Sequence, residues 1–290
     1  MYNAIMPYNY THALLGVASA RLFQEDAQCI FDAYPDAFFI GTMGPDPYYA
    51  DAMPRPLFRT CRAGLADMLH STDGKQLFTA LVEAAGDNRL RQAYALGFLC
   101  HFMLDYSVHP YVYAFFPGDA HTPGEIAMDA LMVKRSGDSR FSVPPKAFWR
   151  TANLDGLDAY HADFIELLYG QHTRGVFARS LRKWLSVNTL SYDPSGRKYR
   201  FFQKASPHIA GFLQTPARAD AEDALNLSHR PWPGHPDHPE RTDSFVDLFE
   251  VAVSAAADCC NLFATAMCTH GHEALNHALD AVAGRDMDAT

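Results

Sequence analysis

The sequence has few of the features that mark secreted, membrane-spanning or nucleic-acid-binding proteins. Near Met1 there is no basic start followed by an apolar run and a small-residue cleavage site, and no stretch reaches the ~18 apolar residues of a membrane span. We therefore expect a cytoplasmic protein with at most peripheral membrane contact. The cysteines lack zinc-knuckle spacing and the framework of a disulfide-stapled domain, so we interpret them as reduced core thiols: Cys29, Cys61, Cys100, Cys259, Cys260 and Cys268.

Positive charge is also scarce. The chain has 24 Lys and Arg against 33 Asp and Glu, a formal net charge of -9. The electrostatic field of the whole protein therefore repels a long polyanion such as DNA. We expect no nucleic-acid partner, whereas a local cation could still hold a small phosphate ester. The oligomeric state is not encoded in any pattern that we recognise.

Alternating strand patterns and internal repeats are absent too, and most of the chain has helical periodicity. With 290 residues, of which 48% are hydrophobic, the chain can bury one large core or two small ones. The segments rich in Pro, Gly or Ser, at residues 41–56, 136–145, 192–200 and 228–243, predict breaks between helices but no long linker. We therefore predict an all-α fold with a single multi-helix domain over residues 1–290.

Individual helices are predicted from apolar residues at three- and four-residue spacing. Thr11 is predicted to cap the first helix, and Pro110 to stop the fourth. The last predicted stretch is one long helix or two broken ones. The predicted helices cover residues 12–23, a stretch from about 26, and residues 56–70, 88–106, 155–169, 175–187 and 243–283.

The most informative stretch is residues 97–110, GFLCHFMLDYSVHP, which sets polar residues at regular spacing in an apolar run. His101, Asp105 and His109 are four residues apart, and four residues are about one helical turn. His101 and Asp105 thus share one helix face that is expected to lie in the core. Because a buried imidazole and a buried carboxylate both need partners, this spacing predicts a metal site.

Other candidate ligands flank this stretch. His121 and Glu125 repeat the one-turn spacing in the first turn of a predicted helix, where Pro123 is tolerated. Three single residues come earlier in the chain: His12, Asp46 and His70. Taken alone, each has a simpler interpretation. His12 could be a core histidine bonded to a carbonyl, Asp46 a turn residue, and His70 a helix end.

The order of these candidates resembles the bacterial zinc-dependent phospholipase C family. The resemblance rests on His12, Asp46, His70, HxxxD at His101 and Asp105, His109 before a proline, and HxxxE at His121 and Glu125. It covers approximately residues 8–134, which we call the metal-site half, and leaves a helical C-terminal half at about residues 135–285. The resemblance implies an all-helical fold of the phospholipase C and zinc nuclease type, with a polynuclear Zn2+ site of two or three ions in its core.

The resemblance also implies a role for each ligand. One zinc ion would be bound by Asp46, His70, His101 and Asp105, and a second by His109, His121 and Glu125. A third would share Asp105 with His12 and, in secreted family members, with an N-terminal tryptophan. Here the chain departs from the family, because its first tryptophan is Trp149. Either another group, such as the Met1 amine or water, completes the third site, or only two ions bind tightly.

The implied activity is hydrolysis of a phosphate ester by metal-activated water, with Asp46 as both a ligand and the general base. The substrate would be a small phosphate ester or a phospholipid. Two alternatives stay open. One is a single-strand-specific zinc nuclease, although such nucleases carry HxxxD where this chain has His121 and Glu125. The other is a non-catalytic metal-binding protein that kept the fold.

Overall fold

The computed structural model describes residues 9–52, 63–215, 224–234 and 240–288 of the chain. Over these residues the protein has no β-strand, only two isolated bridges, so the all-α prediction is confirmed. Short 3-10 segments separate some helices, and the one that carries a candidate ligand is η1, Asp46–Ala52. The α-helices are α1 Asn9–Ala20, α2 Glu25–Ala33, α3 Pro35–Gly41, α4 Ala63–His70, α5 Gly74–Ala85, α6 Arg89–Phe115, α7 His121–Ser136, α8 Pro145–Phe148, α9 Leu154–Tyr169, α10 Val176–Ser191, α11 Arg197–Ala205, α12 Pro207–Gly211, α13 Phe245–Thr269 and α14 His272–Asp280.

Each predicted helix is present, and most described ends are displaced by a few residues, while the fourth helix continues well beyond its predicted end at residue 106. The third prediction is seen only as α4, because residues 53–62 lie outside the described part of the chain. The last predicted stretch is two helices, α13 and α14, separated by His270 in the left-handed conformation. Sequence periodicity missed α3, α5 and the short helices α8, α11 and α12, and α11 begins inside a predicted break.

Thr11 does not cap the first helix, because α1 already includes Asn9. The backbone N–H and the hydroxyl of Thr11 both donate to Asp129 Oδ1 of α7, at 2.6 and 2.8 Å. A carboxylate from another helix therefore satisfies first-turn donors that a local cap would otherwise satisfy. The prediction failed because this partner is 118 residues away in the sequence.

Pro110 does not stop the fourth helix either, since α6 runs on to Phe115. Proline removes one backbone hydrogen bond and crowds the preceding turn, at a cost of about 3 kcal/mol. The turn after Pro110 is held by packing. Tyr111 is fully buried and its ring contacts Trp232 and Phe245, with centroids 5.4 and 5.8 Å apart.

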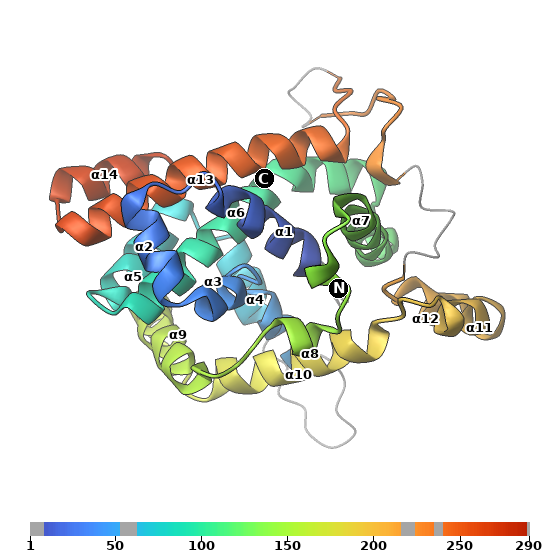
Figure 1. Cartoon of the computed structure of the whole chain (residues 1–290), viewed down its shortest axis with the longest axis horizontal. Helices are drawn as coiled ribbons and strands as arrows, with labels where there is room; N and C mark the ends of the chain where they lie inside the picture. The colour runs from blue at the N-terminus through green and yellow to red at the C-terminus, as the bar shows by residue number, and fades with distance from the viewer. Residues whose placement is uncertain (1–8, 53–62, 216–223, 235–239, 289–290) are drawn as a thin grey trace.

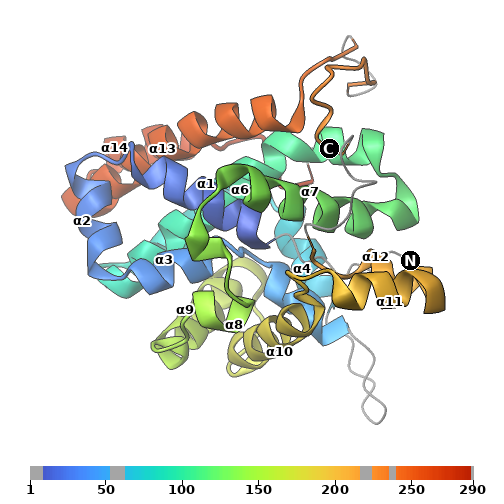
Figure 2. The same cartoon turned by 45° about the vertical axis from the view of Figure 1, so that its right-hand side comes forward.

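The 27-residue helix α6 passes through the middle of the molecule (Figure 1). It packs against α3 and α13 most extensively, and also against α1, α2, α5, α7 and α9. In Figure 2 the helices of the N-terminal part and α13 lie around α6 on different sides. The middle of α6 is therefore surrounded by protein, and its polar side chains His101, Asp105 and His109 are buried.

One hydrophobic core includes residues from Tyr10 to Met287, so both halves of the chain contribute to it. The prediction of a single domain over residues 1–290 stays a prediction, which this shared core supports. Among the described helices, α13 alone is long and apolar enough to cross a membrane by length and composition. Half of its most apolar window is buried inside the protein, and core helices pass the same test.

Helices α3 and α6 cross at two glycines, and this crossing sets the position of the candidate site. A Cβ atom added to Gly41 would lie 2.2 Å from the carbonyl oxygen of Tyr94, and one added to Gly97 would lie 2.0 Å from that of Phe38. Backbone therefore meets backbone, with no room for a side chain. His101 follows Gly97 by one turn, so the close crossing brings it to the segment after α3.

We predict that Gly41→Ala destabilises the protein, because the added methyl group collides with rigid backbone. The expected loss in the free energy of unfolding is about 1–3 kcal/mol. Gly64→Ala is the matched control, since Gly64 is exposed near the start of α4 with nothing within 4 Å of the added Cβ. It should gain about 0.5–1 kcal/mol from helix propensity. Urea unfolding followed by circular dichroism measures the free energy of unfolding of both variants. Equal changes in the two variants would contradict the close backbone contact at Gly41.

Candidate metal centre

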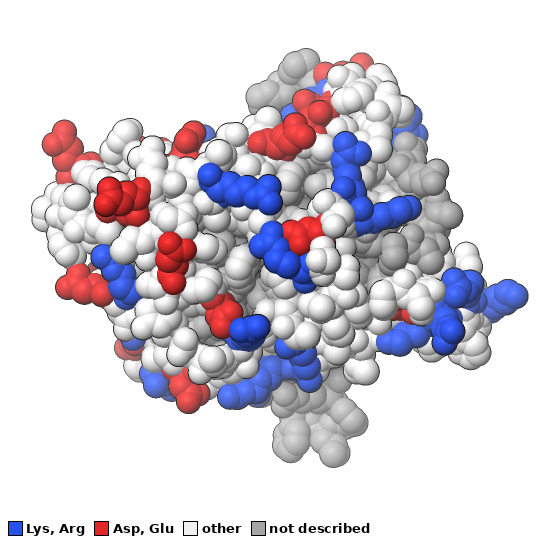
Figure 3. All heavy atoms as spheres, in the orientation of Figure 1, with Lys and Arg blue, Asp and Glu red and all other residues white. Residues whose placement is uncertain are grey.

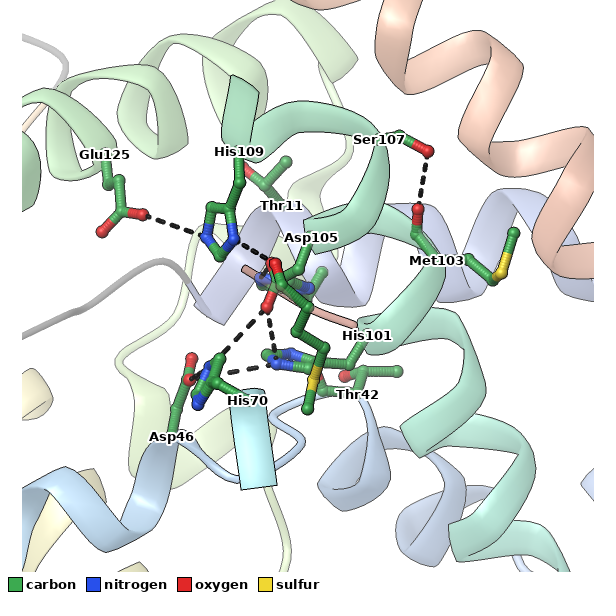
Figure 4. Close-up of polar contacts among 12 residues, drawn as sticks. Thr11, Thr42, Asp46, His70, His101, Met103, Asp105, Ser107, His109 and Glu125 are labelled. Carbon is green, nitrogen blue, oxygen red and sulfur yellow. Dashed lines mark hydrogen bonds and ion pairs between the residues drawn. The ribbon is translucent and has the colours of Figure 1, made fainter. Parts of the chain in front are cut away.

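The eight predicted ligands come from five separate elements and lie near one another. Those of the central helix α6, His101, Asp105 and His109, follow one another at one-turn intervals along one side (Figure 4). The others are supplied by α1, which carries His12, by η1, which begins at Asp46, by α4, which ends at His70, and by α7, which carries His121 and Glu125. All except His121 are buried. The fold thus gathers the whole predicted set in its interior.

Asp46, His70 and His101 form the first group, with ligand-type atoms within 4.8 Å of one another. His70 Nε2 lies 3.4 Å from Asp46 Oδ1, and His101 Nε2 lies 3.9 Å from the same oxygen. In Figure 4 the two rings and the carboxylate point toward a common space. A turn at Gly44, with φ of +49°, leads into η1 and passes directly over the His101 ring.

Asp105 joins the first group to His12. Its Oδ2 atom lies 2.9 Å from His101 Nε2 and 3.8 Å from His70 Nε2, while its Oδ1 atom lies 3.3 Å from His12 Nε2. His12, His101 and Asp105 form a second possible metal-binding group. The His12 and His101 rings are stacked, with centroids 4.2 Å apart. One carboxylate is therefore shared between two groups.

His109, His121 and Glu125 form the third group. Glu125 Oε1 lies 3.0 Å from His121 Nε2 and 4.0 Å from His109 Nε2. His121 is the most exposed of the predicted ligands, with 18% of its side chain accessible. The ring of Tyr113, which is 43% exposed, lies beside both histidines at centroid distances of 5.3 and 5.4 Å. The described part of the centre is therefore most open at the start of α7.

Backbone carbonyl groups orient three of the imidazoles. The Nδ1 atom of His70 donates to the carbonyl of Ala66 at 2.9 Å, that of His101 donates to Thr42 at 3.2 Å, and that of His109 donates to Met287. A carbonyl can only accept, so the proton of each neutral ring is on Nδ1 and the Nε2 lone pair faces the groups. Sequence patterns had not indicated Thr42 or Met287, because a carbonyl acceptor has no side-chain signature.

Several ligand-type atoms are left without a hydrogen bond in the described protein. They are His70 Nε2, His101 Nε2, Asp46 Oδ1 and Glu125 Oε2, all buried. Their short contacts with neighbouring groups lack hydrogen-bond geometry. Burying such atoms without partners costs about 1–3 kcal/mol for each, and more for charged groups. Imidazole nitrogens and carboxylate oxygens are the donors that Zn2+ prefers, so the residues fit a metal.

The pKa values reflect how little water reaches these groups. Burial lowers the pKa of His12 well below its usual value and that of His101 to about 4, and it raises the pKa of Asp105 to about 6. Burial also opposes protonation of His70, but the adjacent Asp46 carboxylate outweighs it and raises the pKa of His70 to about 9. Without a cation, the buried carboxylates of this centre thus depend on a protonated imidazole for compensation.

Asp129 is a supporting residue that sequence reasoning missed. It is completely buried on α7, one turn after Glu125, and it receives the two hydrogen bonds from Thr11 of α1 described above. The side-chain amide of Gln214 also donates to it. Asp129 thereby ties the helix that carries His12 to the helix that carries Glu125. A carboxylate at four-residue spacing after Glu125, in the apolar run IAMDALM, was a signal that could have identified it.

The fold and the site define an all-helical protein with a buried set of imidazole and carboxylate groups arranged as metal ligands. The family model of zinc-dependent phospholipase C matches residues 11–178, more than half of the chain, and includes all eight predicted ligands. The chain belongs to the zinc-dependent phospholipase C family, which is a family of hydrolases. No curated protein and no solved structure gives a significant match.

We predict that Asp129→Ala destabilises the protein, because it leaves the buried Thr11 donors without an acceptor. The free energy of unfolding should fall by about 1–3 kcal/mol for each donor left unpaired. Asp129→Asn keeps one acceptor oxygen and should lose less. Asp87→Ala is the control, since the Asp87 side chain is 86% exposed, and it should change stability by less than about 0.5 kcal/mol. Equal unfolding midpoints in urea for all three variants would contradict this role of Asp129.

Proposed function

We propose that this protein hydrolyses phosphate esters with a zinc cluster, as a phospholipase C-like enzyme. The observation that carries the proposal is the convergence of eight imidazole and carboxylate side chains from five elements, with four buried ligand-type atoms that have no hydrogen bond among the described residues. Family membership supports the same conclusion. The substrate class is a phosphate ester, which includes phospholipids and small water-soluble esters.

In this proposal the three groups hold two or three zinc ions. In this proposal Asp46, His70, His101 and Asp105 bind one ion, and His109, His121 and Glu125 bind another. His12 and Asp105 contribute to a third. Because residues 1–8 lie outside the described part of the chain, the suggested contribution of the Met1 amine stays a prediction. When bound, zinc supplies Lewis-acid stabilisation of phosphate oxygens and lowers the pKa of a water molecule toward ~7.

The protein's own groups would then act as follows. A carboxylate oxygen of Asp46 would accept the proton of the attacking water, whose oxygen forms the new bond to phosphorus while the bond to the ester oxygen breaks. The leaving oxygen would take up a proton from the Asp46 carboxyl group or from solvent and depart as an alcohol. His70, His101 and His109 are held in fixed orientation by their Nδ1 hydrogen bonds, so little reorganisation is needed during the reaction. Tyr113 lies beside His109 and His121, where it can contact an apolar or cationic part of the substrate.

Aromatic residues flank the predicted ligands in the sequence, at Tyr48, Tyr49, Tyr111, Tyr113, Phe115 and Phe116. Tyr48, Tyr49 and Tyr111 are buried in the core. Phe115 and Phe116 are partly buried and pack against the core. Tyr113 is the exposed member of this set in the described structure.

The nuclease alternative has less support. Glu125 stands where the resembling nucleases carry aspartate, and the net charge of -9 disfavours a long polyanion. An activity assay separates the non-catalytic alternative from the phospholipase C-like and the nuclease alternatives. Protein purified without chelator should be assayed on a chromogenic phosphodiester, on phosphatidylcholine vesicles and on single-stranded DNA. Turnover of the first two but not the DNA supports the proposal, whereas no turnover at full zinc content refutes it.

We predict that His101→Ala and Asp105→Asn each lower the zinc content and the melting temperature together, because ligand bonds to a metal contribute to folding. Turnover of the phosphodiester should fall by at least about 100-fold, since the bound metal supplies most of the transition-state stabilisation. Elemental analysis, thermal unfolding and the assay measure these effects.

His161→Gln is the matched control. His161 is a buried imidazole bonded to Tyr48 and lies outside the three groups, so this variant should lose stability but keep its zinc. Full zinc content in both ligand variants would refute the ligand assignment.

We predict that His12→Ala removes at most one ion per chain, because His12 belongs to only one of the three groups. Elemental analysis should show the remaining zinc retained, and the variant should stay folded. His109→Ala provides the comparison, since His109 belongs to the group at the other end of the cluster. Loss of every ion from His12→Ala would contradict the picture of separate sites.

A further inference from the structure

Helices α11 and α12 form a short helical hairpin that projects from the body of the protein (Figures 1 and 2). Its inner side has its own small apolar cluster, in which Tyr199, Ala210 and Leu213 are buried and Phe202 packs against them. The buried Asp193 carboxylate accepts the backbone N–H of Tyr199 at 2.8 Å, which fixes the start of α11. The hairpin is therefore an ordered projection with a distinct outer side.

The outer side of α11 is strongly basic in a protein that is acidic overall. Four cationic residues occur within this nine-residue helix, and the sequence has no Asp or Glu between Asp193 and Asp220. Figure 3 shows blue side chains gathered on this projection, with little red beside them. All four are exposed: Arg197, Lys198, Arg200 and Lys204.

Large apolar side chains are exposed among these cations. Phe201 is 65% exposed, and it follows Arg197 by four residues and precedes Lys204 by three, so the three side chains share one helix face. Ile209 of α12 is 43% exposed. Leu190, at the end of α10, is 72% exposed, and its carbonyl accepts a hydrogen bond from Lys198 Nζ. Exposed apolar side chains next to cations are typical of elements that bind membrane surfaces.

The hairpin also lies next to the open end of the metal centre. A Cβ atom added to Gly211, at the end of α12, would lie 3.5 Å from Pro123 Cγ. Pro123 is in the first turn of α7, between His121 and Glu125. The basic and apolar hairpin therefore adjoins the turn that carries the most accessible predicted ligands.

We propose that the α11–α12 hairpin binds the surface of a membrane that contains anionic phospholipids, with Phe201, Leu190 and Ile209 inserted among the lipids and the cations at the headgroup level. The proposal concerns where the enzyme meets its substrate, and in that respect it rests on the proposed function. A lipid surface fits better than a nucleic acid, because the face combines aliphatic side chains with cations and the whole protein has a net charge of -9. The local field of the hairpin acts within about one Debye length, ~8 Å at physiological salt, so the distant acidic residues oppose it little.

The test is binding of the zinc-loaded, full-length protein to vesicles, measured by co-sedimentation. We expect binding to phosphatidylcholine vesicles that contain phosphatidylglycerol, weaker binding to pure phosphatidylcholine, and loss of binding at high salt. Arg197→Gln with Lys204→Gln should weaken binding about fivefold for each cation removed. Phe201→Ser with Ile209→Ser should weaken it at least tenfold, since two apolar insertions are lost.

Lys75→Gln with Leu167→Ser is the matched control. These two exposed residues line a hollow between α5 and α9, away from the hairpin, and replacing them removes one cation and one apolar side chain without affecting the proposed surface. The control should bind vesicles like the unmodified protein. No binding by the unmodified protein, equal binding by all variants, or preferential binding to single-stranded DNA would overturn the proposal.

Hydrolysis of the soluble chromogenic phosphodiester separates this proposal from the proposed function. Hairpin variants should keep that activity, because none of their substituted residues belongs to the metal centre. Vesicle binding without any turnover would support the hairpin proposal and refute the function. Turnover without vesicle binding would refute the hairpin proposal alone.

Discussion

The structure depends on burying several imidazole and carboxylate groups together, far from water. In a medium of low dielectric constant an isolated carboxylate is costly, and Asp105 shows how that cost is shared. One of its oxygens faces His12 and the other faces His101 and His70. Atoms without a hydrogen bond remain on His70, His101, Asp46 and Glu125 even so. Cations bound at the separate groups would compensate these atoms.

Much of the rest of the fold holds this cluster in place. The crossing of α3 and α6 at Gly41 and Gly97 places the Thr42 carbonyl against His101. Asp129 ties α1 to α7 through Thr11. Each support joins parts of the chain that are distant in sequence, so the local geometry of the cluster depends on the packing of the whole helical body. Such a site is preorganised and costs little rearrangement on binding.

The cluster is not equally enclosed on all sides. The start of α7, with His121 and the nearby Tyr113 ring, is its most accessible described end. The α11–α12 hairpin adjoins that end through Gly211 and Pro123. Hydrolysis of a phospholipid requires both a metal centre that reaches the phosphate and a surface that tolerates the lipid interface. The two proposals together assign these requirements to neighbouring parts of one molecule.

The sequence by itself determined the helical class, because helical periodicity is a local property. The family and the full set of candidate ligands came from a resemblance, which rests on the order of ligand-type residues along the chain. The resemblance implied that Asp105 is shared between two metal sites, but the contacts themselves come from tertiary structure: Asp105 lies against both His12 and His101 because α1 packs against α6. Local rules also failed at Thr11 and Pro110, where Asp129 and the packing of Tyr111 override the usual cap and stop signals. Tertiary structure alone decided the supporting carbonyls, the role of Asp129 and the exposure of Phe201, because each depends on contacts between segments far apart in the chain.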